Sequence, residues 1–546
     1  MQQTSESTTG ATTSTTATAS APTTGARDRI LSFAPATGEL VGEAPVHDAA
    51  AVRAAVERAR RAQVSWGALP VRDRCERMLR LRDLLLEREA EVSDLIARET
   101  GKPVMEALLH EVAPTLHLLE YFAKHAEKIL APREVPLSLV VHRKSVLYYA
   151  PRGVVGVISP WNFPFLLPMR DILLAVFAGN AVVLKPSEIT PTIALRMKQL
   201  WDRAGLPADL FQVVTGYGAT GAALIDAGIQ LCVFTGGVAT GKRVAAACGE
   251  RLIPCVMELG GKAPLIVCRD ADVELAARAA VFGGFANAGQ VCISVERVYV
   301  HREVAERFTS RVVELTRELR VGDSRAGAAD VGAITFPKQI DIAEAHIADA
   351  VSKGAEILVG GKRKLDPIQN PASPSGSRGP GAFFEPTVLG GCDHHMTVMT
   401  EEIFGPIVPI MRVSSDEEAL RFANSSHLGL NAYVFTRDRA YGERLASQVE
   451  AGSILVNDVL MNAALPEVPF GGVKQSGFGR VLGDDSLREM CDVRHVNVDR
   501  FPMGSKNPLW YPYTERGLAV ARRTVGLVFG GGRGLSGLVK RLSRLV

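Results

Sequence analysis

The sequence offers little that would build a metal centre, a disulfide framework or a membrane anchor. Its eight cysteines are scattered, with no Cys-x-x-Cys pair and no His/Cys cluster at zinc spacing. No apolar run approaches the roughly 20 residues that a membrane-spanning helix needs, which argues against an integral membrane protein. The 62 Lys and Arg residues balance 59 Asp and Glu residues, and a formal charge of +3 is too small to indicate nucleic acid as a partner.

The N-terminal segment lacks the features of a targeting sequence. Residues 1–26 hold a single charge, at Glu6, among Thr, Ser, Ala and other small or polar residues. They have neither the basic start and apolar run of a secretory signal nor the arginines of a transit peptide. Because this composition cannot form a core, it predicts a disordered leader over residues 1–27 and a cytoplasmic protein.

What is present is an α/β pattern long enough for two or more domains. Residues 48–100 have helical spacing of apolar side chains, and Gly101-Lys102-Pro103 supplies a stop. From residue 153 onward, short β-branched runs alternate with helical stretches, which predicts a parallel sheet with βαβ crossovers. The expected strands cover residues 154–158, 181–184, 211–214, 231–234 and 255–259.

A second set of strands follows Gly289, over residues 295–300, 407–413, 432–436 and 453–457, and it predicts a second α/β domain. Between the strands of this set lie residues 363–381. They are rich in Pro, Ser and Gly, and we expect an extended surface loop there.

Three polar segments could carry chemistry. Cys292 follows two amide side chains and a glycine, although on this segment alone an inert core thiol is the more common reading. Glu258 ends a predicted strand before two glycines, where a general base, a helix cap or a salt-bridge partner would all fit. Asn162 lies in Pro-Trp-Asn-Phe-Pro, and its clamped amide could stabilise an oxyanion or merely cap the next helix.

Two further segments follow strands of the first sheet. Lys185-Pro186-Ser187-Glu188 comes after one strand, and Phe234-Thr235-Gly236-Gly237, which leads to Gly241, comes after another. Nucleotides bind at the carboxyl ends of parallel strands, and a glycine turn before a helix suits phosphate. Many βα turns need a glycine, so this signal is weak by itself.

Together these segments resemble the aldehyde dehydrogenase superfamily over about residues 30–505. Seven motifs occur in the family's order and at about its spacing: Pro160-Trp161-Asn162-Phe163-Pro164, Lys185-Pro186-Ser187-Glu188, Phe234-Thr235-Gly236, Glu258-Leu259-Gly260-Gly261-Lys262, Gly289-Gln290-Val291-Cys292, Glu401-Glu402-Ile403-Phe404-Gly405-Pro406 and Pro469-Phe470-Gly471-Gly472-Val473-Lys474-Gln475-Ser476-Gly477.

The resemblance implies an α/β fold with a parallel-sheet nucleotide-binding domain, an α/β catalytic domain and a β oligomerisation arm. The first domain would span 28–260, interrupted by an arm segment near 131–151, and the second would span 261–467. A strand at 488–502 would complete the arm of a homodimer or homotetramer. Residues 139–141 and 493–498 have the β-branched character that an intersubunit strand needs.

The resemblance also assigns the chemistry. Cys292 would attack the aldehyde, Asn162 and the backbone N–H of Cys292 would hold the oxyanion, and the thioester left after hydride transfer would be hydrolysed. Glu258 would be the general base for that water, which favours a free acid over transfer to coenzyme A. No metal is expected.

For the cofactor, the resemblance places Lys185 and Glu188 on the adenosine ribose and Glu402, beside Phe404, on the nicotinamide ribose. A carboxylate at Glu188 favours NAD over NADP because it would repel the 2′-phosphate of NADP. The other expected contacts are Trp161, Thr235, Gly236, Gly237 and Gly241. The family usually has Ser where this chain has Gly237, so we expect weaker cofactor binding.

The substrate is less clear, but the tail at 503–546 gives an indication. Residues 514–546 carry seven basic residues against one acid, and 535–546 place leucines and valines on one helical face and basic residues on the other. This pattern predicts an interfacial helix on an anionic membrane, and it favours an apolar aldehyde, long-chain or terpenoid-like. The alternative is a helix packed on the enzyme or its partner subunit.

Two other functions stay open on the sequence. A semialdehyde dehydrogenase, for instance for succinic semialdehyde, would need a cationic group in the pocket. A non-catalytic structural member of the family would be expected to lack the thiol, the base or the amide, and all three are present at Cys292, Glu258 and Asn162.

Overall fold

The computed structural model describes residues 29–140, 142–364, 381–501 and 510–529. The predicted leader, nearly all of the predicted loop at 363–381 and the helix expected at 535–546 lie outside the described residues. The chain divides into two compact units, one of Met1–Ala131 with Tyr149–Asp492 and one of Pro132–Tyr148 with Val493–Val546.

A six-stranded sheet of the larger unit contains all five strands predicted from residue 153 onward. Its order is β21-β9-β8-β5-β6-β7, with β5 Val154–Ile158, β6 Ala181–Lys185, β7 Phe211–Val213, β8 Leu231–Thr235, β9 Cys255–Glu258 and β21 Gly477–Phe478. Strands β5 to β9 are parallel to one another, and β21 runs antiparallel to β9. The strand order changes direction at β5, and the carboxyl ends on either side of such a point are where α/β sheets bind nucleotides.

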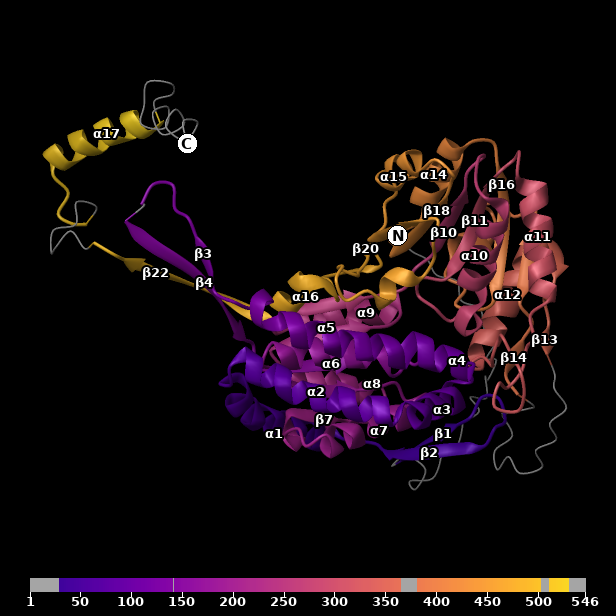
Figure 1. Cartoon of the computed structure of the whole chain (residues 1–546), viewed down its shortest axis with the longest axis horizontal. Coiled ribbons are helices and arrows are strands. Elements are labelled where there is room, and N and C mark those ends of the chain that lie inside the picture. The colour runs from indigo at the N-terminus through magenta and orange to yellow at the C-terminus, as the bar shows by residue number, and fades with distance from the viewer. Residues whose placement is uncertain (1–28, 141, 365–380, 502–509, 530–546) are drawn as a thin grey trace, which may run out of the picture. The chain divides into compact units, whose positions relative to one another are not determined.

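The crossovers of this sheet are α6 Leu166–Phe177, α7 Pro191–Arg203, α8 Gly218–Asp226 and α9 Val238–Glu250. The N-terminal helices are α1 Ala49–Gly67, α2 Val71–Glu87 and α3 Glu89–Thr100, and Figure 1 shows α2 beside α5 Ala113–Ile129 and α6. Gly101 closes α3 in the left-handed conformation, with φ 82°, so the predicted helix stop is confirmed. The chain then resumes as α4 Val104–Ala107 and a π-helix, η2 Leu108–Val112.

A second sheet of the larger unit has seven strands in the order β12-β15-β16-β11-β10-β18-β19. The four predicted strands correspond to β11 Val295–His301, β16 Ile407–Val413, β18 Asn431–Phe435 and β19 Ser453–Val456, joined by β10 Ala263–Val267, β12 Glu356–Val359 and β15 Thr387–Gly390. The sequence did not predict β10, although it is central. Pro264 argues against a central strand, and a register shift between Ala263 and Pro264 accommodates it.

The smaller unit contains most of a three-stranded sheet, β22-β4-β3, whose strands are β3 Arg133–Val135, β4 Arg143–Pro151 and β22 Cys491–Asp499. The expectation of a strand at residues 139–141 was wrong for residues 139 and 140, and residue 141 lies outside the described residues. Leu139 and Val140 lie in the turn that joins β3 to β4. The same unit includes α17 Glu515–Phe529, none of whose residues is buried. Among the described residues, no helix has both the length and the apolar character to cross a bilayer.

Candidate active site

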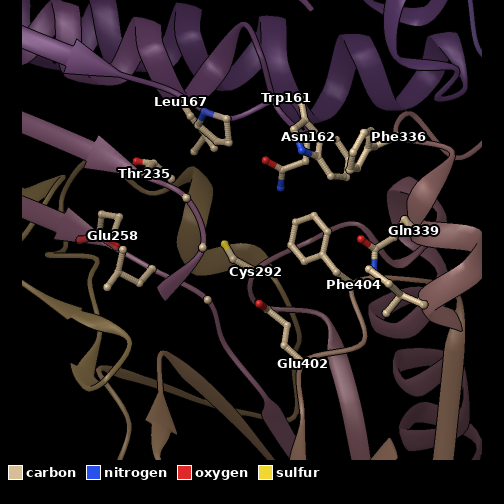
Figure 2. A pocket seen from close by; sticks show the side chains of 16 residues that line it. Trp161, Asn162, Leu167, Thr235, Glu258, Cys292, Phe336, Gln339, Glu402 and Phe404 are labelled. Carbon is tan, nitrogen blue, oxygen red and sulfur yellow. The ribbon is translucent and has the colours of Figure 1, made fainter. Parts of the chain in front are cut away.

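Two adjoining cavities open at the carboxyl ends of the strands of the first sheet. One, of about 340 Å³, is lined by Cys292, Glu258 and Asn162, and the other, of about 540 Å³, lies over β5, β6 and β8. Both are lined by Pro160, Trp161, Thr235, Gly236 and Gly237. The structure therefore brings all three predicted catalytic residues together around one space (Figure 2).

Cys292 follows a tightly constrained turn, η4 Ala286–Gly289, that leads into β11. Asn287 and Ala288 both have left-handed backbones, with φ 51° and 53°, which is strained for residues with a side chain. A Cβ at Gly261 would lie 2.1 Å from the carbonyl oxygen of Cys292, so only glycine permits this approach. Burial, with a smaller contribution from the charge of Glu258, raises the pKa of the Cys292 thiol to about 12.

Glu258 is the last residue of β9 and is 3 % exposed. Neither carboxylate oxygen has a hydrogen-bond partner among the described residues. Burial raises the pKa of this carboxyl group to about 8, while the positive charge of Arg170 opposes the rise. A buried carboxyl group without partners and with a pKa near neutrality has the properties of a general base.

Asn162 lies in the loop between β5 and α6, and its side chain points into the smaller cavity (Figure 2). Its Nδ2 donates a hydrogen bond to the backbone oxygen of Gln290 at 2.9 Å, directly before the cysteine loop. A primary amide has two N–H groups. One is donated to Gln290, and the described residues provide no partner for the other.

Arg170 and Asp171 form a buried ion pair that the sequence reading overlooked. The two side chains are 4 % and 1 % exposed, and Nε of Arg170 lies 2.9 Å from Oδ1 of Asp171. The Nη2 of Arg170 has no partner among the described residues. Burial raises the pKa of both Glu258 and Cys292, and the positive charge of Arg170 opposes both rises. An Arg-Asp pair inside the otherwise apolar helix α6 was a usable signal, because charges are rarely buried without a reason.

The larger cavity has the features of a nucleotide site. Lys185 Nζ lies 3.2 Å from Glu188 Oε2, and both line the cavity, with Lys185 nearly buried and Glu188 partly exposed. Gly237 precedes the first turn of α9, and no atom lies within 4 Å of the Cβ that a larger residue would add there. Gly241 lines neither cavity. Its added Cβ would meet Leu259 at 2.4 Å, which indicates a packing role.

Glu402 and Phe404 also line the smaller cavity. A carboxylate oxygen of Glu402 accepts the N–H of Gly261 at 3.0 Å, and burial raises the pKa of this carboxyl group. Phe404 has a left-handed backbone, φ 53°, stabilised by a hydrogen bond of 2.8 Å from its N–H to Glu296. Its ring meets Trp161 edge-on at 5.4 Å. Trp161 and Phe404 together form an aromatic surface of the cavity against which a flat ring could pack.

The comparison with known protein families agrees with this geometry. The model of the aldehyde dehydrogenase family matches residues 23–496. The chain belongs to this family. It is an NAD(P)-dependent enzyme of aldehyde oxidation, and the α/β fold expected from the resemblance is confirmed.

Three relatives illustrate the range of this family. A 4,4′-diapolycopene aldehyde oxidase of Methylomonas sp. is 39% identical over 505 residues, 92% of this chain and 91% of that protein. An aldehyde dehydrogenase from Bacillus cereus, solved as an NAD+ complex, has a TM-score of 0.81 and 32% identity over 86% of this chain and 93% of that one. A succinate-semialdehyde dehydrogenase from Burkholderia pseudomallei has a TM-score of 0.81 and 33% identity over 86% and 94%.

The residues of the aldehyde dehydrogenase site fit a dinucleotide. The hydroxyl groups of Ser159 and Thr235 are buried, have no partner among the described residues and line the larger cavity. The first turn of α9 presents backbone N–H groups of the kind that bind phosphate, and the open space at Gly237 leaves its backbone accessible. Among the described residues, no cluster of three His, Cys, Asp or Glu side chains suits a metal ion.

The sequence reading also missed the residues that close the smaller cavity. Phe336, Gln339 and Ile342 line it and come from α12 Lys338–Ser352 and the turn before it. Leu167 lines it from α6. No local pattern sets these residues apart, because Phe336, Gln339 and Ile342 reach the cavity only through the packing of α12 and the turn before it, and Leu167 is one of many apolar residues in α6.

Proposed function

We propose that this enzyme oxidises an aldehyde to a free carboxylic acid through a thioester at Cys292, which water activated by Glu258 then hydrolyses. One observation carries the proposal. The thiol of Cys292, the amide of Asn162 and the buried carboxyl group of Glu258, which has no hydrogen-bond partner among the described residues, line a single cavity, and a second cavity of about 540 Å³ adjoins it. The non-catalytic alternative would predict the loss of one of these three groups.

In the first step, the Cys292 thiol loses its proton to solvent, and the sulfur attacks the carbonyl carbon as a thiolate. The free N–H of Asn162 and the backbone N–H of Cys292 donate hydrogen bonds to the oxygen as it gains negative charge. Burial raises the pKa of the Cys292 thiol, and the positive charge of Arg170 offsets part of this rise, which favours the thiolate. A nicotinamide held beside Phe404 would supply the acceptor for the hydride of the carbonyl carbon.

In the second step, Glu258 takes a proton from the water that attacks the thioester. The ionised carboxylate is the active form, and its pKa of about 8 makes this base effective near and above neutral pH. Water adds to the acyl carbon, the carbon–sulfur bond breaks, and the acid leaves with the Cys292 sulfur restored.

We propose NAD as the preferred cofactor, with NADP as a possible substitute. Lys185 and Glu188 would hold the adenosine ribose, and Glu188 would accept a hydrogen bond from its 2′-hydroxyl and repel a 2′-phosphate. Trp161, Thr235, Gly236 and Gly237 would surround the rest of the dinucleotide, and Glu402 the nicotinamide ribose beside Phe404. The predicted contact of Gly241 stays a prediction.

We propose an apolar aldehyde, long-chain or terpenoid-like, as the substrate. No Lys or Arg is among the described residues that line the cavity around Cys292, whereas Leu167, Phe336 and Ile342 are. A semialdehyde dehydrogenase would need a cation to hold the second carboxylate, and Arg170 is buried beside the cavity rather than exposed in it. The similarity to succinate-semialdehyde dehydrogenases keeps that activity as the second candidate.

A panel of short, aromatic, long-chain and carboxylated aldehydes, each with NAD and NADP, tests these proposals. We expect the highest kcat/KM for a long apolar aldehyde with NAD, and a free acid as the product by mass spectrometry. A preference for succinic semialdehyde would overturn the substrate proposal. Product formation that depends on coenzyme A would overturn the hydrolytic one.

We further propose that residues 514–546 contact an anionic membrane surface from the cytoplasmic side. In α17, Leu518, Val525 and Phe529 fall within one helical arc and are exposed. Arg516 and Arg523 lie on the opposite side, which they share with the exposed Val520 and Leu527, so the division into an apolar and a basic face rests on the sequence of 535–546. Deleting 514–546 should abolish sedimentation with anionic liposomes and leave that with neutral ones unchanged. Equal sedimentation of both forms would support the alternative, a helix packed on the enzyme or its partner subunit.

We propose a homodimer or homotetramer built through the smaller unit. The strand β22 lies at the edge of its sheet, with Val493, Val496 and Val498 exposed, and such an edge can pair with another copy. The division into a nucleotide domain at 28–260, a catalytic domain at 261–467 and an arm strand at 488–502 stays part of this proposal. Light scattering of the full chain would measure the assembly.

A further inference from the structure

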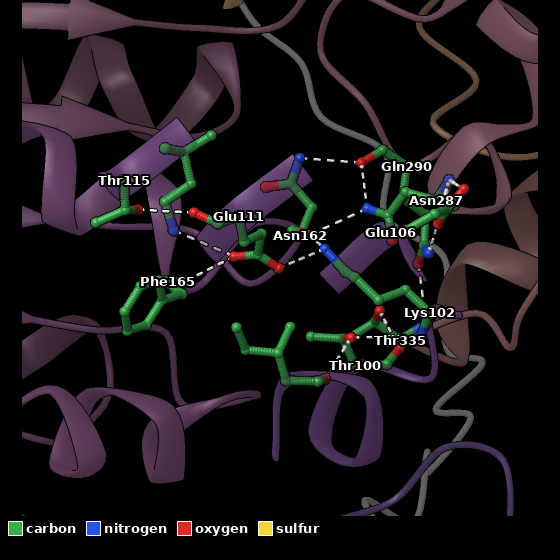
Figure 3. Close-up of polar contacts among 12 residues, drawn as sticks. Thr100, Lys102, Glu106, Glu111, Thr115, Asn162, Phe165, Asn287, Gln290 and Thr335 are labelled. Atoms are coloured by element: carbon green, nitrogen blue, oxygen red, sulfur yellow. Dashed lines mark hydrogen bonds and ion pairs between the residues drawn. The ribbon is translucent and has the colours of Figure 1, made fainter. Parts of the chain in front are cut away.

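Three charged side chains, Lys102, Glu106 and Glu111, lie close to Asn162 and Asn287 (Figure 3). None of the three lines either cavity. We call them the positioning network. They belong to α3's exit loop, α4 and the π-helix η2, a stretch to which the mechanism above gives no role. From the sequence, this stretch predicted only a helix stop, at Gly101-Lys102-Pro103.

Glu111 and Lys102 hold the asparagine loop. Their ion pair spans 2.6 Å and both side chains are 0 % exposed. Glu111 also accepts the backbone N–H groups of Phe165 and Leu166, at 2.8 and 3.2 Å. Lys102 donates to the backbone oxygen of Asn162 itself, at 2.9 Å. The Lys102–Glu111 pair therefore holds the loop between β5 and α6 at two points, at Asn162 and at Phe165.

Glu106 holds the cysteine loop. Its two carboxylate oxygens accept the backbone N–H of Asn287, each at 3.0 Å, where the chain takes up its left-handed turn. The Asn287 side chain then joins the two loops, because its Nδ2 donates to the backbone oxygens of Asn162 and Gln290, at 3.0 and 3.1 Å. Glu106 thus stabilises the strained residue that links both loops.

The π-helix explains how one short stretch reaches both loops. Glu106 and Glu111 are five positions apart, which places them on different faces of an α-helix. A π turn is wider, with hydrogen bonds between residues i and i+5, and it brings such positions closer to one face. Single π turns are rare and occur frequently at functional sites.

We propose that Glu106 and Glu111 are positioning residues that set the distance between the Asn162 amide and the Cys292 sulfur. The inference rests on the catalytic roles proposed for Asn162 and Cys292. Neither carboxylate touches the reacting atoms. Each holds, through backbone hydrogen bonds, one of the two loops that must converge on the same carbonyl group, and Asn287 joins them.

The test compares Glu106→Gln and Glu111→Gln with Glu99→Gln as a matched control. Glu99 is also a buried carboxylate that accepts backbone N–H groups, those of Thr192 and Ile193 at 2.9 Å each, but it lines neither cavity and contacts neither catalytic loop. All three variants are compared in the full-length protein for thermal stability, NAD affinity, and the single-turnover rate of NADH formation.

Misplacement of a catalytic group by about 1 Å costs on the order of 100-fold in rate, which is the loss expected for Glu111→Gln. Burial raises the pKa of Glu106 to about 7, so above that pH Glu106→Gln replaces a charge-assisted hydrogen bond by a neutral one, and we expect about a tenfold loss in rate there. In both variants KM and NAD affinity should stay near the wild-type values, because the loss falls on the transition state. Glu99→Gln should lower thermal stability and keep the wild-type rate.

Wild-type single-turnover rates in folded Glu106→Gln and Glu111→Gln would overturn the inference. So would a loss in all three variants that follows their thermal stability, or a rise in KM without a change in rate. Removing the charge of Glu111 leaves Lys102 unpaired and can prevent folding. Glu106→Gln leaves the Lys102–Glu111 ion pair intact. If Glu111→Gln does not fold, the rate of Glu106→Gln alone tests the inference.

A second measurement separates this inference from the proposed function. Alkylation of Cys292 by iodoacetamide, followed by peptide mass spectrometry without cofactor or aldehyde, reports the placement of the cysteine loop directly. Glu106→Gln should alkylate faster, because a looser loop exposes the sulfur and lets its pKa fall. An unchanged alkylation rate would overturn the role of Glu106. An inactive wild-type enzyme, in contrast, would overturn the proposed function.

Discussion

The polar groups that line the cavity and the polar groups behind it differ in how they are bonded. In the cavity, both oxygens of Glu258 and the hydroxyl of Thr235 have no partner among the described residues. In the positioning network, Lys102 and Glu111 each make two or more hydrogen bonds, and Glu106 holds Asn287 with both oxygens.

This difference in hydrogen bonding distinguishes groups that can react with a ligand from groups that position the reactive ones. A buried group without partners has an uncompensated desolvation energy and is left able to bind a ligand or accept a proton. A fully bonded buried group has little left to offer a ligand but holds its neighbours firmly. We therefore expect substitutions in the cavity to remove individual chemical steps, and substitutions in the network to affect the geometry of those steps.

The largest effect is expected from Cys292→Ala, because without the nucleophile no thioester forms. The rate of aldehyde oxidation should fall on the order of 10⁴-fold or more, measured as steady-state NADH formation. Cys255→Ala is the control, since Cys255 is also a partly exposed thiol but lines neither cavity. Activity that survives Cys292→Ala would contradict the mechanism.

Glu258→Gln should slow turnover by about 100-fold to 10,000-fold while the first burst of NADH persists, because the base acts after hydride transfer. In the wild type the pKa of Glu258 is raised to about 8, so the active carboxylate increases as the pH rises through that value. The rate of thioester hydrolysis should rise with it, and this rise should disappear in Glu258→Gln. Loss of the burst itself would show that Glu258 acts earlier.

Asn162→Ala should lower the burst rate by about 100-fold to 1,000-fold, the usual loss for one oxyanion donor. KM should change little, because the hydrogen bond strengthens only as the oxygen gains charge. Stopped-flow measurement of NADH formation separates the two parameters. A rise in KM with an unchanged burst rate would assign Asn162 to substrate binding instead.

The smallest effect is expected from Gly237→Ser, which adds a hydroxyl at the start of α9. The space at Gly237 accommodates the side chain, and one added hydrogen bond to the pyrophosphate should tighten NAD binding about fivefold. Gly237→Ala adds the Cβ without the hydroxyl and serves as the control. A Kd for NAD that is the same in Gly237→Ser and wild type would refute the expected weakness of the natural glycine.

The strands of the first sheet could be predicted almost to the residue, because β5 and β6 are short valine-rich runs bounded by turns. The central strand β10 could not, because Pro264 obscures it until the register shift beside β11 is visible. In the site, motifs identified Cys292, Glu258 and Asn162. Arg170 escaped notice, because its importance lies in its electrostatic interaction with Glu258, which is 88 positions away in the chain.

The sequence by itself determined the family, the order of the strands along the chain and the three groups proposed for catalysis, because these depend on local residue types and on motifs in a fixed order. Only the tertiary structure decided which carboxyl groups lack partners and which are fully bonded. Glu258 and Glu111 are both buried acids, and nothing local distinguishes the environment of one from that of the other. Their difference arises from which N–H groups the fold brings within hydrogen-bonding distance.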